Sequence, residues 1–194
     1  MIIHQAASLL LCYPGDDWPD RRTLVEQALH GIPGDAAARL RRFCAQTAAT
    51  APLELARTYV ATFDRSNRRT LHMTYYTDGD TRRRGMSLAR LKSLYRTYGW
   101  LPDAAELPDF LPLMLEFAAR CPEPGTDLLQ AHRPGIDVLC AALTKYGGPY
   151  ADVLPAVAAG LGDPTSAQRR LARAITAGGP PTETVGVEAL GAYR

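Results

Sequence analysis

Apolar residues recur every three or four positions along most of the chain, which is the spacing of one face of an α-helix. No run alternates apolar and polar residues with β-branched enrichment, so no strand is predicted. Helices are predicted over residues 2–13, 19–31, 37–51, 53–63, 81–98, 110–118, 128–146, 151–161 and 165–177. The pattern therefore predicts an all-α protein, with a single compact helical domain of about eight or nine helices over residues 1–178.

Two segments break the helical pattern. Residues 64–80 are polar and predict a long mid-chain connection with a short helical turn, and residues 101–109 form a second loop. Asp109 can cap the helix that follows this loop, and Pro112 falls in its first turn, where proline is tolerated. That helix is apolar nearly all round, as expected of a central buried helix. Residues 179–194, rich in glycine and proline, predict a disordered tail.

Composition narrows the class of protein. Hydrophobic residues make up 46% and charged residues 22%, which is typical of a globular chain. The pI of about 8.4 is below the value of about 9 expected of a nucleic-acid-binding domain. The first apolar run has no basic start and no cleavage site, so it predicts neither a secretory signal nor a membrane span. We therefore expect a cytoplasmic protein without stable membrane association.

Catalytic chemistry has little support in the sequence. The four cysteines have no C-x-x-C spacing and lie among apolar residues, so we expect them to be reduced core residues. There is no nucleophile elbow, no P-loop and no dinucleotide-binding fingerprint. His72 lies near Asp78 and Asp80 in sequence, but this is weak evidence for a metal site. An enzyme that uses residues 64–80, with or without a metal, is a minor alternative.

Residues 59–116 can be interpreted as a binding surface. Aromatic residues alternate there with charges of both signs, a composition that protein interfaces favour, although a solvated loop is the simpler reading. The second loop adds carboxylates that could accept hydrogen bonds from arginines of a partner. Asp109 is explained by helix capping, whereas Glu106 has the least structural reason to be there. The arginine-rich segment 82–96 leaves a nucleic-acid-binding regulator as an alternative.

Three stretches of this region resemble a known family, the nitrate reductase molybdenum-cofactor assembly chaperones. These are the NarJ type within the TorD/DmsD group of redox-enzyme chaperones. The stretches are Tyr59-Val60-Ala61-Thr62-Phe63-Asp64, the segment from Leu71 to Leu88 with its Y-Y-x-x-G-D-T-R-x-R-G string, and Glu106-Leu107-Pro108-Asp109-Phe110-Leu111-Pro112 leading to Leu115-Glu116-Phe117. The motifs lie within residues 59–118, and the helix pattern and length agree with the family over residues 1–178.

The resemblance implies a non-enzymatic cytosolic chaperone. Such proteins bind the N-terminal segment of the nitrate reductase catalytic (alpha) subunit while the molybdenum cofactor is inserted, and they delay docking onto the membrane subunit. The cofactor belongs to the client, the chaperone has no cofactor or metal of its own, and proteins of molybdenum cofactor biosynthesis are further expected partners. No nucleic-acid partner is implied.

The resemblance also assigns client-binding residues. Glu106 and Asp109 would meet arginines of the client, and the pair Tyr75-Tyr76 would anchor its apolar face. Arg82 and Arg84 are two residues apart and cannot share a helix face, so one is expected to pair with Asp78 or Asp80. The whole expected set is Tyr59, Phe63, Asp64, Tyr75, Tyr76, Asp78, Asp80, Arg82, Arg84, Glu106, Leu107, Pro108, Asp109 and Phe110. Phe110 stands where many relatives have histidine, which makes the expected contact more apolar.

Overall fold

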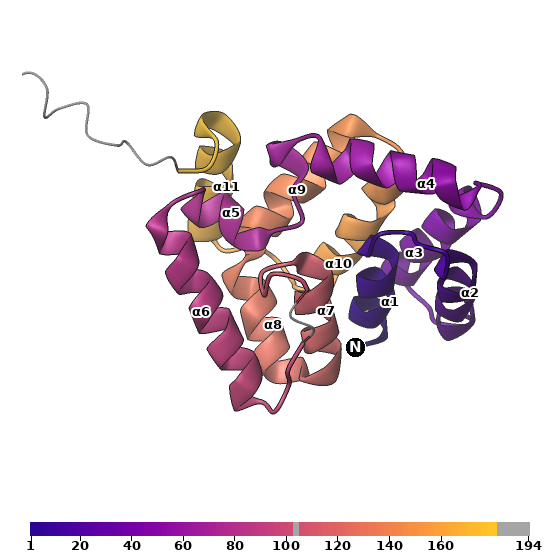
Figure 1. Ribbon diagram of the computed structural model, residues 1–194, viewed down its shortest axis with the longest axis horizontal. Coiled ribbons are helices and arrows are strands. Elements are labelled where there is room, and N and C mark those ends of the chain that lie inside the picture. Colours follow the sequence, from indigo (N-terminus) through magenta and orange to yellow (C-terminus); the bar gives the residue numbers. More distant parts are fainter. Residues whose placement is uncertain (103–104, 182–194) are drawn as a thin grey trace, which may run out of the picture.

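The computed structural model describes residues 1–102 and 105–181, and these residues fold as helices without a β-strand. Figure 1 shows their arrangement. The α-helices are α1 (Ile2–Leu11), α2 (Trp18–Ala28), α3 (Asp35–Thr47), α4 (Pro52–Tyr59), α5 (Met73–Asp78), α6 (Arg82–Thr97), α7 (Leu111–Arg120), α8 (Pro122–Ala131), α9 (Arg133–Tyr146), α10 (Val153–Ala159) and α11 (Ser166–Gly178). A π-helical turn, η1 (Val60–Asp64), and two 3-10 turns, η2 (Asn67–Arg69) and η3 (Pro149–Asp152), complete the described elements.

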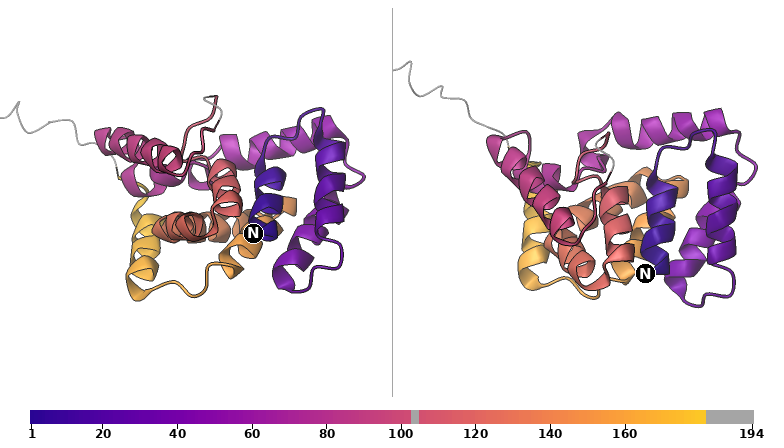
Figure 2. Two further views of the ribbon diagram at one scale, coloured as in Figure 1. Left: turned by 90° about the horizontal axis from the view of Figure 1, so that it is seen from below. Right: turned by 60° about the horizontal axis from the view of Figure 1, so that its bottom comes forward.

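The core lies around α7. Leu111, Met114, Leu115 and Phe117 are fully buried, and α7 packs between α1 on one side and α8 on the other. Pro112 lies in the first turn of α7, where it costs no intrahelical hydrogen bond. The two views of Figure 2 show α1, α7 and α8 side by side, with α6 on the α8 side of this row. The prediction of a central, nearly all-apolar helix is confirmed.

A second layer is formed by α9, α10 and α3. α10 packs against α3, α1 and α9, and α11 packs along α9. Thr165 caps α11 in a capping box with Gln168, which satisfies two backbone donors that a helix start leaves free. The all-α prediction is confirmed, and the chain forms one compact helical domain.

Two predicted elements differ in extent from the structure. The helical turn expected in the mid-chain connection is a short helix, α5, and the single helix expected over residues 128–146 is two helices that meet at His132. Pro134 occupies the first turn of α9, where proline favours a new helix start over continuation of α8. These two differences account for eleven α-helices within the described residues, against nine predicted segments.

Most of the predicted tail, residues 182–194, lies outside the described residues. None of the described helices combines the length and the apolar character that a membrane span requires. All four cysteines are free; Cys44 is buried, and Cys12, Cys121 and Cys140 are half-buried.

Candidate functional site

Two of the three motif-bearing stretches, residues 71–88 and 106–112, lie side by side although residues 89–105 separate them in sequence. The backbone N–H of Leu111 donates to the carbonyl of Leu71 (2.8 Å), and that of Met73 donates to the carbonyl of Asp109 (3.0 Å). His72 and Phe110 pair in an isolated antiparallel bridge, with their rings 5.6 Å apart. The start of α5 and the loop before α7 therefore form one unit, which carries the candidate site.

Asp109 is the polar centre of this unit. Its side chain is fully buried, and Oδ2 accepts hydrogen bonds from the backbone N–H of Thr74 (3.2 Å) and from the Thr74 hydroxyl (2.5 Å). His72 Nδ1 donates to Oδ1 across 3.1 Å. The expectation that Asp109 caps the helix that follows it was wrong, because Phe110 is the N-cap of α7 and makes no side-chain cap bond. Asp109 instead satisfies the N-terminus of α5, a helix 35 residues earlier in the chain.

The surroundings of Asp109 favour its charged form. Burial by itself raises the pKa of this carboxyl. Hydrogen bonds from His72 and Thr74 and the electrostatic effects of His72 and Arg84 lower the pKa by more than burial raises it, so the pKa lies below its ordinary value. Arg84 Nη2 lies 3.6 Å from Asp109 Oδ2, which brings the first turn of α6 into the same cluster.

Arg84 connects this buried cluster to the surface. Its Nη1 is 3.3 Å from Asp80 Oδ1, and its guanidinium carbon lies 6.0 Å from the centroid of the Tyr75 ring. The expected pairing of one motif arginine with Asp78 or Asp80 is therefore found at Arg84. Tyr75 is half-buried, whereas Asp80 and Arg82 are exposed.

Tyr76 and Asp78 lie inside the fold. The Tyr76 hydroxyl donates to the carbonyls of Thr70 (3.0 Å) and Arg68 (3.3 Å), and burial raises its pKa well above the ordinary value. Its ring lies against Gly135 of α9, where an added Cβ would come within 3.1 Å of the ring. Asp78 Oδ2 accepts from the Ser87 hydroxyl (2.6 Å), which ties the end of α5 to α6. In this structure both side chains hold α5 in place and neither faces solvent.

Tyr59 and Phe63 belong to a separate aromatic cluster. Their rings lie 4.9 Å apart, and Phe63 is 4.9 Å from Tyr150. The Tyr59 hydroxyl donates to the carbonyl of Leu11, and burial raises its pKa. Both residues are buried, and Asp64 is exposed at the end of η1. These residues join α1, α4 and η3 and are not part of the cluster around Asp109.

The loop before α7 has a fixed base and an exposed tip. The carbonyl of Pro108 accepts a 2.7 Å hydrogen bond from the buried Tyr95 hydroxyl, and Asp109 is held as described. Glu106 and Leu107 are exposed, Leu107 by 42%, and Phe110 is half-buried. The tip therefore presents one carboxylate and one apolar side chain on a backbone that is anchored from beneath.

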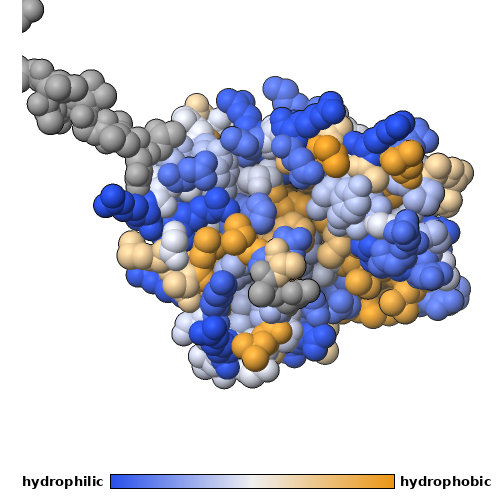
Figure 3. Space-filling model, viewed as in Figure 1, coloured by the Kyte–Doolittle hydropathy of each residue, from blue (hydrophilic) through white to orange (hydrophobic). Residues whose placement is uncertain are grey.

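An apolar groove on α1 and α2 was missed in the sequence. It is lined by Leu9, Cys12, Tyr13, Asp17, Asp20, Arg21 and Leu24. Tyr13 is 53% exposed and Leu24 56% exposed. On the side of the molecule seen in Figure 3, apolar side chains gather in the middle and again beside α1. The available signal was Tyr13 itself, a large aromatic residue placed next to the Pro14-Gly15 helix stop, where no helix continues to cover it.

Charged residues of the groove and of the loop tip affect the pKa of the Cys12 thiol at the end of α1. Burial raises the pKa of the Cys12 thiol; the positive charge of Arg21 lowers it, and the charges of Glu116, Glu106 and Asp17 raise it. The groove also holds an ion pair, between Arg21 and Asp17 at 2.6 Å. The exposed residues of the tip and of the groove are together named here the acidic face (Glu106, Leu107, Tyr13, Asp17, Asp20 and Leu24).

The described residues do not support the metal site considered from the sequence. Among residues 1–102 and 105–181, no three histidine, cysteine or carboxylate side chains come together as a metal site. His72 uses Nδ1 to hold Asp109. The chemistry available at this surface is recognition through hydrogen bonds, ion pairs and apolar contact.

Comparison with known proteins identifies the family. The sequence description of the family called nitrate reductase delta subunit matches residues 31–155. The chain belongs to this family. It is 42% identical over 157 residues to the nitrate reductase-like protein NarX of Mycobacterium tuberculosis (strain ATCC 25618 / H37Rv). This match covers 80% of the chain and 24% of NarX.

Two further relatives are NarJ proteins. The chain is 35% identical over 167 residues to NarJ of Bacillus subtilis (strain 168), covering 82% of the chain and 88% of that protein. It is 30% identical over 148 residues to the nitrate reductase molybdenum cofactor assembly chaperone NarJ of Escherichia coli (strain K12), covering 74% and 63%. The NarJ relatives bear the names of assembly chaperones and not of catalysts, in agreement with the expected non-enzymatic role. The chain spans about a quarter of the length of NarX.

Proposed function

We propose that this chain is a chaperone of nitrate reductase maturation that binds the N-terminal segment of the catalytic subunit. In this role it keeps the subunit open in the cytoplasm until the molybdenum cofactor is inserted, and it delays assembly at the membrane. The names of the NarJ relatives and the NarJ-type motif of residues 71–88 and 106–112 support the client. The cofactor is the client's cargo, and proteins of its biosynthesis are transient partners.

The observation that carries the proposal is the contrast between the two ends of the loop before α7. Asp109 and Pro108 are buried and hydrogen-bonded, so they serve the fold. The side chains of Glu106 and Leu107 are exposed on the same short loop, and neither makes a hydrogen bond or ion pair among the described residues; only the carbonyl of Leu107 serves the fold, by accepting from the backbone N–H of Phe110. An anchored backbone that presents a charged and an apolar side chain is a preorganised binding element, because little entropy is lost when it engages a partner.

The acidic face suits a segment that combines apolar residues with arginines. Tyr13, Leu24 and Leu107 would bury apolar side chains of the client, the main source of affinity in peptide recognition. Glu106 and Asp20 would accept hydrogen bonds from its guanidinium groups, which bind carboxylates in two-pronged geometry, whereas Asp17 already accepts from Arg21. An amphipathic helix in a groove is the recognition mode that this combination favours.

The residues predicted for client binding then divide by their position. Glu106, Leu107 and Phe110 would touch the client, with Tyr75, Asp80 and Arg82 at the edge of the surface. Asp109, Arg84, Asp78 and Tyr76 would position them from inside. Contact with Tyr76 would require α5 to leave α9, because its ring lies against Gly135.

Calorimetric titration with a synthetic client peptide tests the proposal. The peptide is the first fifteen or so residues of the nitrate reductase catalytic subunit of the same genome, with a scrambled peptide as control. We expect saturable one-to-one binding at about micromolar affinity, with a negative heat-capacity change from apolar burial. Equal heats from the two peptides, or none from either, would contradict the proposal.

A further inference from the structure

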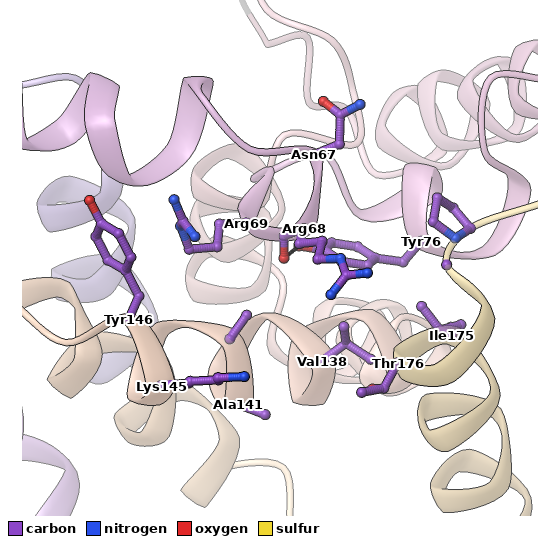
Figure 4. Close-up of a pocket in the computed structure, with 13 residues that line it drawn as sticks. Asn67, Arg68, Arg69, Tyr76, Val138, Ala141, Lys145, Tyr146, Ile175 and Thr176 are labelled. Carbon is purple, nitrogen blue, oxygen red and sulfur yellow. Dashed lines mark hydrogen bonds between the residues drawn. The ribbon is translucent and has the colours of Figure 1, made fainter.

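A second groove, apart from the acidic face, lies between α5, α9, α11 and the segment 67–69. It encloses about 470 Å³, and its floor is made of small apolar side chains: Val138, Ala141 and Ala142 of α9 with Ile175 of α11. Figure 4 shows Arg68 and Arg69 on one side of it, α9 on the other and α11 closing one end. A shallower depression lined by Asp137, Ala172 and Arg173 continues it along α9 and α11.

The unpaired charges among the described residues around this groove are positive. Arg68 and Lys145 are exposed and have no ion pair among the described residues, and Arg173 is likewise exposed on α11. Arg69 is used by the fold, since its Nε donates to the carbonyl of Thr62 (2.7 Å) and its guanidinium stacks on the Tyr146 ring at 3.9 Å. The carboxylate in the continuation, Asp137, is already paired with Arg133 at 2.7 Å. The groove therefore has free positive charge and no free negative charge among its described lining residues.

We propose that this groove, named here the basic groove, binds an acidic amphipathic helix of a partner protein. The small side chains at Ala141, Ala142 and Thr176 leave room for a helix backbone to approach closely, and Tyr146, 48% exposed, offers an aromatic anchor at one end. Arg68 and Lys145 would pair with carboxylates at the edges of that helix. The charge of the basic groove is opposite to that of the acidic face, so the two surfaces select different partners.

A peptide fits this site better than a nucleic acid. A polyanion is bound by a row of cations along its backbone, whereas the described lining of the basic groove is an apolar floor with two unpaired cations, Arg68 and Lys145, beside it. Part of the groove also lies outside the matched family segment, because α11 begins at Ser166 and the family description ends at residue 155. The groove shares one motif residue, Tyr76, with the proposed function, and none of the residues given to the acidic face lines it.

Fluorescence anisotropy with a designed probe tests the inference on the full chain. The probe is a fluorescein-labelled helical peptide of about 14 residues, roughly 21 Å long, with leucine and alanine on one face and glutamate on the other. Controls are the same peptide with lysine for every glutamate, a scrambled peptide and a single-stranded oligonucleotide. We expect saturable binding of the glutamate probe alone, and equal binding of the scrambled peptide or the oligonucleotide would overturn the inference.

Variants locate the binding. Arg68→Glu with Lys145→Glu should weaken the glutamate probe by about tenfold, since two attractive pairs become repulsive. Arg57→Glu with Arg90→Glu changes the net charge equally at exposed positions of α4 and α6 and should leave affinity within about twofold. Ala141→Phe places a large ring in the groove without a charge change and should also weaken binding. Equal losses in the two charge-reversal variants, or no loss in Ala141→Phe, would contradict binding at this groove.

Discussion

The carboxylate of Asp109 holds the first turn of α5 by accepting two hydrogen bonds from Thr74, one from its backbone and one from its hydroxyl. The two residues are 35 positions apart, so this contact joins two of the three motif-bearing stretches into one unit. His72 donates a hydrogen bond to the buried carboxylate, and the guanidinium of Arg84 lies 3.6 Å from it. The exposed loop tip at Glu106 and Leu107 is supported by this buried cluster.

Replacement of Asp109 tests the cluster. Asp109→Asn keeps the shape but puts an amide where His72 and Thr74 donate, so donors are left facing an NH2 group in a buried site. We expect a loss of about 2–4 kcal/mol in the free energy of unfolding, measured with urea. Asp80→Asn removes an exposed partner of Arg84 and should cost less than about 0.5 kcal/mol. Equal losses in the free energy of unfolding for the two variants would show that the buried cluster contributes no more to stability than the exposed ion pair does.

The lowered pKa of Asp109 predicts the direction of a pH effect. An unfolded aspartate titrates near pH 3.9, and the folded carboxyl titrates below that. The unfolded state therefore binds the proton first, so the stabilisation is fully present above about pH 4 and is lost as pH falls through the folded pKa. In urea titrations the difference in free energy of unfolding between the native chain and Asp109→Asn should shrink as the pH falls below about pH 4. A difference that stays constant to pH 3 would contradict the assignment.

Two helical glycines give a matched pair of substitutions. An added Cβ at Gly125 of α8 would lie 2.2 Å from the Cα of Ala118, whereas at Gly85 of α6 it would meet nothing within 4 Å. Gly125→Ala should therefore lower the free energy of unfolding by about 1–3 kcal/mol, because α7 and α8 must separate. Gly85→Ala should raise it by about 0.5–1 kcal/mol through helix propensity. The same sign for both would show that the close approach of α7 and α8 is wrong.

The adjacent residues Tyr75 and Tyr76 should also differ in how much their hydroxyl groups contribute to stability. Tyr76→Phe removes a hydroxyl that donates to two carbonyls and should cost about 1 kcal/mol of stability. The Tyr75 hydroxyl has no hydrogen bond among the described residues, so Tyr75→Phe should change stability by less than about 0.5 kcal/mol. Thermal or urea unfolding of the two variants gives the comparison, and a larger loss at Tyr75 would reverse the positions given to the pair.

Local sequence patterns were sufficient for most of the fold but not for the site. The apolar run after Pro112 predicts a central helix because burial of such a helix needs no knowledge of its neighbours, and Leu111, Met114 and Phe117 are buried as expected. α5 could not be predicted, because six residues do not make a stable helix alone and its N-terminus is satisfied by Asp109 from a distant loop.

The same physical reason explains the error at Asp109 itself. Capping rules consider the next few residues, and Asp109 stands in a suitable place before α7. The charge instead serves a helix on the other side of the chain, and sequence spacing contains no information on that contact. The groove of Tyr13 and Leu24 was missed for a related reason, since exposure of an apolar residue depends on which neighbouring helices fail to cover it.

Assembly of the client in cells tests the central claim most directly. A strain that lacks this chain would be complemented with the native sequence, with Glu106→Lys plus Leu107→Ser at the loop tip, or with Arg57→Glu plus Arg90→Glu as a control. Nitrate reductase activity and molybdenum content of the catalytic subunit would be measured at equal chaperone levels. We expect both to fall by about tenfold or more with the loop-tip variant and to be unchanged with the control, since about 1.4 kcal/mol of lost binding is a tenfold effect. Full activity and full molybdenum content with a folded loop-tip variant would contradict the account.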